Sequence, residues 1–178
     1  LDSEENALLL ALTELRQSAG ISAPLVVCKS LNTAASAHSD DMRDNAYLSD
    51  KAQDGSTPRQ RSCTAGYKPG CGTTVGMAEV VASGFPDGKS TLPQWTKESS
   101  TKDILTSAAL TVVGVGRSTG GEAVVWTLRP QMAVVAAGLL RFRLDMFSEP
   151  GEEGPSKGVR PREVVQALCG APVADHRV

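Results

Sequence analysis

Two apolar runs with a turn between them decide the fold of this chain: Leu110-Thr111-Val112-Val113-Gly114-Val115-Gly116 and Ala123-Val124-Val125-Trp126-Thr127-Leu128. Both runs are short and rich in β-branched residues, which is typical of strands. The intervening Ser118-Thr119-Gly120-Gly121 is a hairpin signal, so the two strands are expected to pair antiparallel. Residues 140–146 then alternate apolar with charged side chains and predict a strand with one buried face. The sequence therefore predicts a small antiparallel sheet of about three strands.

Helical periodicity surrounds this sheet region. Residues 4–19 and 30–46 each place their apolar side chains on one helical face, and Ser3 and Gly20 suit the two ends of the first helix. Shorter helices are predicted at 77–82, within 92–105 and at 160–168, with loops at 49–74, 83–94 and 148–160. Helices before and after an antiparallel sheet indicate the α+β class, as an α-β-α sandwich. We expect one domain over residues 1–170 and a flexible tail over 171–178.

The composition limits the possible functions. A chain of 178 residues can bury a sizeable core, but only 4% of them are aromatic, so Ala, Val and Leu must build that core. The net charge of −2, with both signs spread along the chain, gives no reason to expect a nucleic-acid partner. No apolar run approaches the roughly 20 residues that cross a bilayer. The acidic, helix-like start after Leu1 is what a processed secreted chain would show, and so would a trimmed one.

The four cysteines, Cys28, Cys63, Cys71 and Cys169, indicate disulfides. They form neither a C-x-x-C pair nor a cluster with histidine, which disfavours zinc and redox sites. Three pairings are possible. The local pair Cys63–Cys71 is favoured because the glycines and the proline between them can turn the chain, and Cys28–Cys169 then remains. The alternative is four buried free thiols in a reducing cell.

A series of short motifs runs through the chain in a set order. They are Leu9-Leu10-Ala11-Leu12-Thr13-Glu14-Leu15-Arg16 with Gly20, Ala34-Ala35-Ser36-Ala37-His38-Ser39-Asp40-Asp41-Met42, Tyr47-Leu48-Ser49-Asp50, Ala65-Gly66-Tyr67, Ala78-Glu79, Trp95, Ile104-Leu105, Gly114-Val115-Gly116 and Val124-Val125-Trp126. Read together, they resemble the CAP superfamily of cysteine-rich secretory proteins, antigen five and pathogenesis-related proteins, especially its bacterial-style SCP branch. The resemblance covers roughly residues 5 to 130 and implies the same α-β-α sandwich.

The resemblance also implies a site, from which this chain departs. In many family members two histidines and two glutamates line a central cleft and can hold a divalent metal. Glu79 matches one of those glutamates, whereas Asp50 stands where the first histidine is usual and Ser99-Ser100-Thr101 where the second is. We therefore expect a degenerate cleft formed by Glu79, Asp50, Ser100 and Thr101, with no metal and no cofactor.

Each candidate also has a simpler structural role. Glu79 could accept hydrogen bonds from backbone amides near a loop, and Asp50 lies just before the turn pair Asp54-Gly55. His38 lies on the apolar face of the 30–46 helix, where a packed ring with satisfied nitrogens is favoured over a ligand or a base. These structural roles are alternatives to a function in the cleft.

The sequence disfavours an enzyme. It has only two histidines and no G-x-S-x-G elbow, so no nucleophile is paired with an oriented base. We expect a non-enzymatic secreted or cell-surface protein, an antigen or adhesin that binds a host-cell receptor or another protein partner through its loops. In architecture and composition the chain is similar to coccidian (apicomplexan) surface antigens. That similarity implies display through a C-terminal GPI lipid anchor. The tail shows no hydrophobic anchor signal, which processing or cloning could have removed.

Two further functions remain open. Some family members bind sterols or other lipids, and here residues 80–85 and 92–95 could line the apolar groove that this requires, although such side chains are more often core. A metal-dependent hydrolase ranks last, because two carboxylates without histidines make a poor zinc centre.

Overall fold

The computed structural model of the protein describes residues 1–69, 71–72, 77–121, 124–132 and 169. In chain order its elements are α1 (Ser3–Ser18), β1 (Val26–Val27), α2 (Lys29–Asp44), α3 (Pro58–Thr64), β2 (Val80–Ser83), α4 (Gly88–Trp95), α5 (Ser99–Leu105), β3 (Leu110–Ser118) and β4 (Val125–Met132). The strands form one sheet in the order β1-β3-β4-β2, and only the β1–β3 pair among them is parallel. The α+β class is confirmed, although the described sheet has four strands rather than about three.

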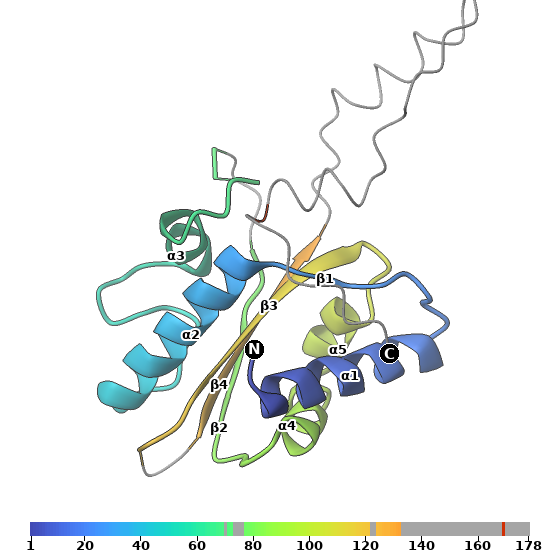
Figure 1. Ribbon diagram of the computed structural model, residues 1–178, viewed down its shortest axis with the longest axis horizontal. Coiled ribbons are helices and arrows are strands. Elements are labelled where there is room, and N and C mark those ends of the chain that lie inside the picture. The colour runs from blue at the N-terminus through green and yellow to red at the C-terminus, as the bar shows by residue number, and fades with distance from the viewer. Residues whose placement is uncertain (70, 73–76, 122–123, 133–168, 170–178) are drawn as a thin grey trace, which may run out of the picture.

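Helices cover both faces of the sheet (Figure 1). α1, α4 and α5 lie on one face, and α2 and α3 lie on the other. The first face carries the main apolar core, which is built from Leu8, Leu12, Val80, Ala82, Leu92, Trp95, Leu105, Val113, Val115, Trp126 and Leu128. Because side chains alternate along a strand, β4 turns Trp126 and Leu128 to this core and turns Thr127 and Arg129 to the side of α2 and α3.

Local signals explain where α1 begins and what holds it in place. Asp2, rather than the expected Ser3, caps the helix, and its side chain and that of Glu5 form a reciprocal capping box. Gly20 follows the helix with a φ of +80°, as expected of a residue at C′. The buried guanidinium of Arg16 donates hydrogen bonds to the carbonyl oxygens of Leu105, Ser107 and Leu110. Arg16 thereby joins α1 to the end of α5 and to the start of β3.

The predicted hairpin is confirmed, and its glycines set the distance to α2. β3 and β4 pair from Leu110–Met132 to Ser118–Val125 across the turn. Gly114 and Gly116 face α2 so closely that a Cβ at Gly116 would lie 2.1 Å from the backbone nitrogen of Ser36. Glycine is therefore required on this face of β3 because the helix backbone occupies the space of a side chain.

Replacing Gly116 with Ala is expected to lower the free energy of unfolding by about 1–3 kcal/mol, because α2 must shift away from the sheet. Gly72→Ala is the matched control, since nothing lies within 4 Å of its Cβ and its φ is not positive. That control is expected to change stability by no more than about 0.5 kcal/mol. Urea denaturation of both variants measures the difference, and equal stabilities would show that the close approach is not limiting.

Four local predictions are corrected by the structure. The helix predicted at 77–82 is wrong: β2 (Val80–Ser83) pairs antiparallel with β4, and its burial alternates with the period of a strand. The helix within 92–105 is divided into α4 and α5, with residues 96–98 between them. The stretch 49–74 contains α3, which begins with a Thr57–Gln60 capping box and Pro58 in its first turn. The stretch 83–94 is likewise helical from Gly88.

Both expected disulfides, Cys63–Cys71 and Cys28–Cys169, are present. Cys28 and Cys169 belong to a second buried cluster with Leu31, Tyr67 and Val112, next to β3. The strand predicted at 140–146, the loop at 148–160, the helix at 160–168 and the tail at 171–178 all lie outside the described residues.

Candidate functional site

The four residues of the expected cleft lie on both sides of the sheet. Glu79 directly precedes β2, and its side chain is completely buried against α2 and α3. Asp50 is exposed in the loop after α2, where its backbone carbonyl oxygen accepts a hydrogen bond from Arg61. Ser100 and Thr101 lie on α5, on the sheet face that carries α1. The structure thus brings Asp50 and Glu79 to one region and places Ser100 and Thr101 elsewhere.

Glu79 is held by side chains rather than by the backbone amides that the sequence suggested. Arg61 of α3 donates a hydrogen bond from Nη2 to Oε1 of Glu79 at 2.6 Å. Arg129 of β4 places its Nη2 atom 2.5 Å from Oε2. His38 of α2 places its Nε2 atom 3.3 Å from Oε1. The carboxylate is therefore enclosed by two guanidinium groups and one imidazole.

Arg129 also anchors α3 to the sheet. Its Nη1 atom donates hydrogen bonds to the Pro58 carbonyl oxygen at 2.7 Å and to the Ser62 hydroxyl at 2.8 Å. Burial lowers the pKa of Arg129 to about 10, and the charge of Glu79 opposes that shift. Arg129 therefore stays charged at neutral pH. Burial likewise raises the pKa of Glu79 to about 7, against the opposing charges of Arg129 and Arg61.

The ring of His38 is packed, as expected, but only one of its nitrogens has a partner. Nε2 lies 2.8 Å from the carbonyl oxygen of Ser49. A carbonyl oxygen can only accept, so this contact assigns the proton to Nε2 and leaves Nδ1 as an acceptor. Nδ1 is buried and has no hydrogen-bond partner among the described residues. Burial lowers the pKa of His38, so the ring is neutral at neutral pH.

These residues do not fit the divalent metal that the resemblance implies. A zinc centre needs several free lone pairs at one point, but Nε2 of His38 carries its proton toward Ser49 and both oxygens of Glu79 face arginines, so Nδ1 of His38 is the one free lone pair of this group. The two guanidinium groups also place positive charge where a cation would approach. Among the described residues, no three His, Cys, Asp or Glu side chains are grouped so as to hold a metal ion.

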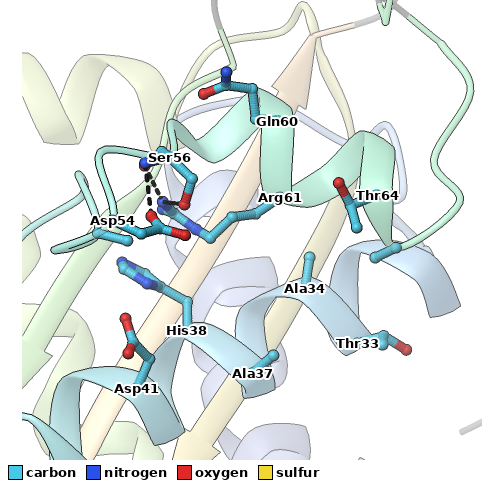
Figure 2. A pocket seen from close by; sticks show the side chains of 12 residues that line it. Thr33, Ala34, Ala37, His38, Asp41, Asp54, Ser56, Gln60, Arg61 and Thr64 are labelled. Carbon is cyan, nitrogen blue, oxygen red and sulfur yellow. Dashed lines mark hydrogen bonds between the residues drawn. The ribbon is translucent and has the colours of Figure 1, made fainter.

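A pocket of about 500 Å³ opens beside this buried network, between α2, α3 and the loop that joins them. Figure 2 shows Ala34 and Ala37 of α2 on its floor and His38 between the carboxylates of Asp41 and Asp54. Asp41 accepts hydrogen bonds from Asn45 and Tyr47, and Asp54 accepts one from the backbone nitrogen of Ser56. The pocket therefore combines small apolar side chains with acidic groups at one end.

Comparison with known proteins places this geometry in a family. The sequence pattern that defines CAP, the cysteine-rich secretory protein family, matches residues 9–129, which is more than half of the chain. The chain belongs to the CAP family. No curated protein is similar enough in sequence to match this CAP domain.

Solved structures agree with the fold of this CAP domain. An outer surface protein from Borrelia burgdorferi superposes with a TM-score of 0.59 at 20% identity, over 75% of this chain and 97% of that one. An extracellular, SCP-domain protein from Bacillus anthracis superposes with a TM-score of 0.54 at 22% identity, over 71% of this chain. The match spans only 41% of that longer protein. In the described part of this CAP domain, no helix is long and apolar enough to cross a membrane.

Sequence reasoning missed the arginines that dominate the site. Arg129 stands in Thr127-Leu128-Arg129-Pro130. Side chains along β4 alternate between the two faces of the sheet, and the face that Arg129 occupies is buried. A charged residue at a buried strand position needs an opposite charge, and that requirement was the available signal. Arg61 carried no such signal, because its position on α3 depends on how that helix packs.

Proposed function

We propose that this CAP domain is a non-enzymatic binding module that acts outside the cell or at its surface and holds a protein partner through its loops. The observation that carries the proposal is the enclosure of Glu79. Its carboxylate is completely buried and engaged by Arg61 and Arg129, so it is not free to act on a substrate. The names of the two similar structures, an outer surface protein and an extracellular protein, support the location. Two disulfides suit the same oxidising environment.

The finer identity also belongs to this proposal. An antigen or adhesin would use exposed loop residues, and the described loop from 45 to 57 offers several next to the pocket. Display by a lipid anchor and a relationship to coccidian surface antigens stay predictions. The loop at 148–160, which we also expected to bind, lies outside the described residues.

The lipid-binding alternative required an apolar groove, and the residues expected to line it belong to the core instead. Val80, Ala82, Leu92 and Trp95 are buried in the main core, and Phe85 packs against it. The indole nitrogen of Trp95 donates a hydrogen bond to the Val81 carbonyl oxygen, which fixes the ring in place. These side chains build the domain and do not line an open apolar surface.

Zinc binding tests the part of the proposal that concerns catalysis. Purified protein mixed with Zn²⁺ and passed through a desalting column is expected to retain far less than one zinc per chain, because the ligands are already engaged. Isothermal titration calorimetry should likewise show no saturable heat. The Glu79→Ala variant serves as the reference. Stoichiometric zinc binding by the wild-type protein that is absent from this variant would indicate a metal site at Glu79 and would overturn the proposal.

Binding to cell surfaces tests the part of the proposal that concerns a partner held by the loops. Fluorescently labelled protein is applied to cells, and unlabelled protein in excess should displace the label. Substituting Lys51→Glu with Gln53→Ala, both exposed in the loop before α3, is expected to reduce saturable binding. The matched control is Lys102→Glu with Asp103→Ala, which are exposed on α5 across the sheet. Equal loss of binding in both variants, or no displaceable binding at all, would contradict binding through the loops.

A further inference from the structure

The two disulfides of the domain differ in their exposure to solvent. Cys71 is exposed and Cys63 is half-buried, whereas Cys28 is completely buried and Cys169 is 5% exposed. Thiol–disulfide exchange begins when a thiolate attacks one sulfur of the bond, so the rate depends strongly on access. A dissolved thiol can therefore approach the Cys63–Cys71 bridge, while the second buried cluster encloses the Cys28–Cys169 bridge.

The helix that contains one end of the exposed bridge, α3, is held mainly by polar contacts. It has seven residues, and Ser62 is the one that is buried. Helices shorter than about 12–15 residues are marginal in water on their own, so α3 depends on its tertiary contacts. Arg129 bonds to the carbonyl oxygen of Pro58 and to the hydroxyl of Ser62, and Arg61 bonds to Glu79. The bridge therefore adds a covalent link to a helix that buries no apolar side chain of its own.

The bridge closes a short loop around Tyr67. The side chain of Tyr67 is buried in the cluster with Leu31 and Val112, and its backbone nitrogen donates a hydrogen bond to the carbonyl oxygen of Ser62. With the bridge open, Tyr67 still ties the end of α3 to the domain, but the loop is no longer covalently closed. Local opening of α3 then becomes more favourable, because the released loop gains conformational entropy.

We propose that the Cys63–Cys71 bridge is a redox switch, which dithiol reductants open and which controls how tightly α3 is held over Glu79. A thiolate of the dithiol attacks Sγ of Cys71, the S–S bond breaks, and Cys63 leaves as a thiolate that takes up a proton. The second thiol of the reductant then displaces Cys71 from the mixed disulfide. The dithiol is thereby oxidised to a disulfide, and the two cysteines gain the two electrons and two protons that it loses.

Opening this bridge would change a defined part of the domain. Gln60, Arg61 and Thr64 of α3 form one wall of the pocket beside α2 (Figure 2). A more mobile α3 therefore alters the pocket and admits water to the buried carboxylate of Glu79, while the Cys28–Cys169 bridge keeps the rest of the domain closed. The switch goes beyond the proposed binding function and does not depend on the identity of a partner.

Differential alkylation tests whether the exposed bridge is opened selectively. The full chain is incubated with dithiothreitol without denaturant, samples are quenched with iodoacetamide over time, and peptide mass spectrometry follows each cysteine. Cys63 and Cys71 are expected to become labelled at least about tenfold faster than Cys28 and Cys169. Oxidised protein treated with iodoacetamide alone is the control and should remain unlabelled.

Hydrogen exchange tests whether the open bridge loosens α3. In the selectively reduced protein the amides of α3 are expected to exchange at least about tenfold faster than in the oxidised protein, while those of β3 stay protected over the same time. The Cys63→Ala, Cys71→Ala double variant should show the same faster exchange without any alkylation. Removing dithiothreitol from unalkylated protein and adding oxidised glutathione should restore the slow exchange.

Three results would overturn the proposal. The first is labelling of all four cysteines at the same rate, and the second is unchanged exchange of α3 in both the reduced protein and the double variant. The third is failure of the reduced protein to recover slow exchange on reoxidation, which would make the bridge a structural bond rather than a switch. None of these measurements involves cells, so each outcome is separate from the test of surface binding.

Discussion

Replacing Arg129 with Met is expected to lower the free energy of unfolding by about 3–5 kcal/mol near pH 8. The variant keeps an apolar chain of similar length but removes one of two cations that face a completely buried carboxylate. It also removes the hydrogen bonds that hold the first turn of α3 against β4. Urea denaturation followed by circular dichroism measures the loss.

The loss of stability in Arg129→Met should depend on pH, and the ionisation of Glu79 determines the direction of that dependence. Burial raises the pKa of Glu79 from 4.5 to about 7, so on raising the pH the unfolded chain releases this proton first. The contribution of Glu79 to stability is therefore fully present below pH 4.5 and is lost as the pH rises through 7. Without Arg129 the pKa of Glu79 rises further, so the contribution of Glu79 to stability continues to fall up to a higher pH. The Arg129→Met penalty is thus expected to be smaller near pH 5 than near pH 8.

Arg43→Met is the matched control for this experiment. Arg43 pairs with Asp40 and Asp44, whose side chains are 52% and 60% exposed. Exposed pairs contribute little, so this variant should lose no more than about 1 kcal/mol. An Arg129→Met penalty that is the same at both pH values would show that lost packing, rather than the lost charge, is its cause.

Removing the Cys28–Cys169 disulfide is expected to have a comparable effect, about 5 kcal/mol on the chain-entropy model. The two cysteines are separated by 141 residues in sequence, and the bond restricts that whole length in the unfolded chain. Both residues should be changed to Ala, since both are buried among apolar side chains and Ala introduces no polar group there. Thermal and urea unfolding of the double variant provide the measurement.

The Cys63–Cys71 disulfide supplies the comparison. Its cysteines are separated by only 8 residues, so replacing both with Ala should lower stability by about 2.5 kcal/mol on the same model. A larger loss from the short bridge than from the long one would contradict the entropic explanation. It would indicate instead that α3 depends on its own bridge for its position.

The sequence predicted those elements whose signal is local and periodic. α1 and α2 follow from apolar stripes, and the β3–β4 hairpin follows from β-branched runs around a Gly-Gly turn. β2 was mistaken for a helix because four residues, Val80–Ser83, are too few to show a period, and its pairing with β4 is a tertiary contact. α3 had a local signal in Thr57-Pro58 and Gln60, which its polar composition concealed.

The site was less accessible to sequence reasoning than the fold. The pattern of motifs led to Glu79, but it could not show that two arginines from separate elements enclose the carboxylate. Those contacts depend on the packing of α3 against β4, which no local pattern encodes. Ser100 and Thr101 were chosen by alignment alone, and the sheet separates them from Glu79. The unused nitrogen of His38 also becomes visible only once the carbonyl of Ser49 is in place.

The long disulfide has a consequence for a protein exposed to proteases. Cys28 and Cys169 lie 141 residues apart, so most of the peptide bonds of this chain fall inside a covalently closed ring. One cut anywhere in the ring opens it to a linear molecule without releasing a fragment. The cleaved protein would keep its mass on a non-reducing gel and separate into two pieces only after reduction. Proteolytic damage to this domain would therefore stay hidden until the bridge itself is broken.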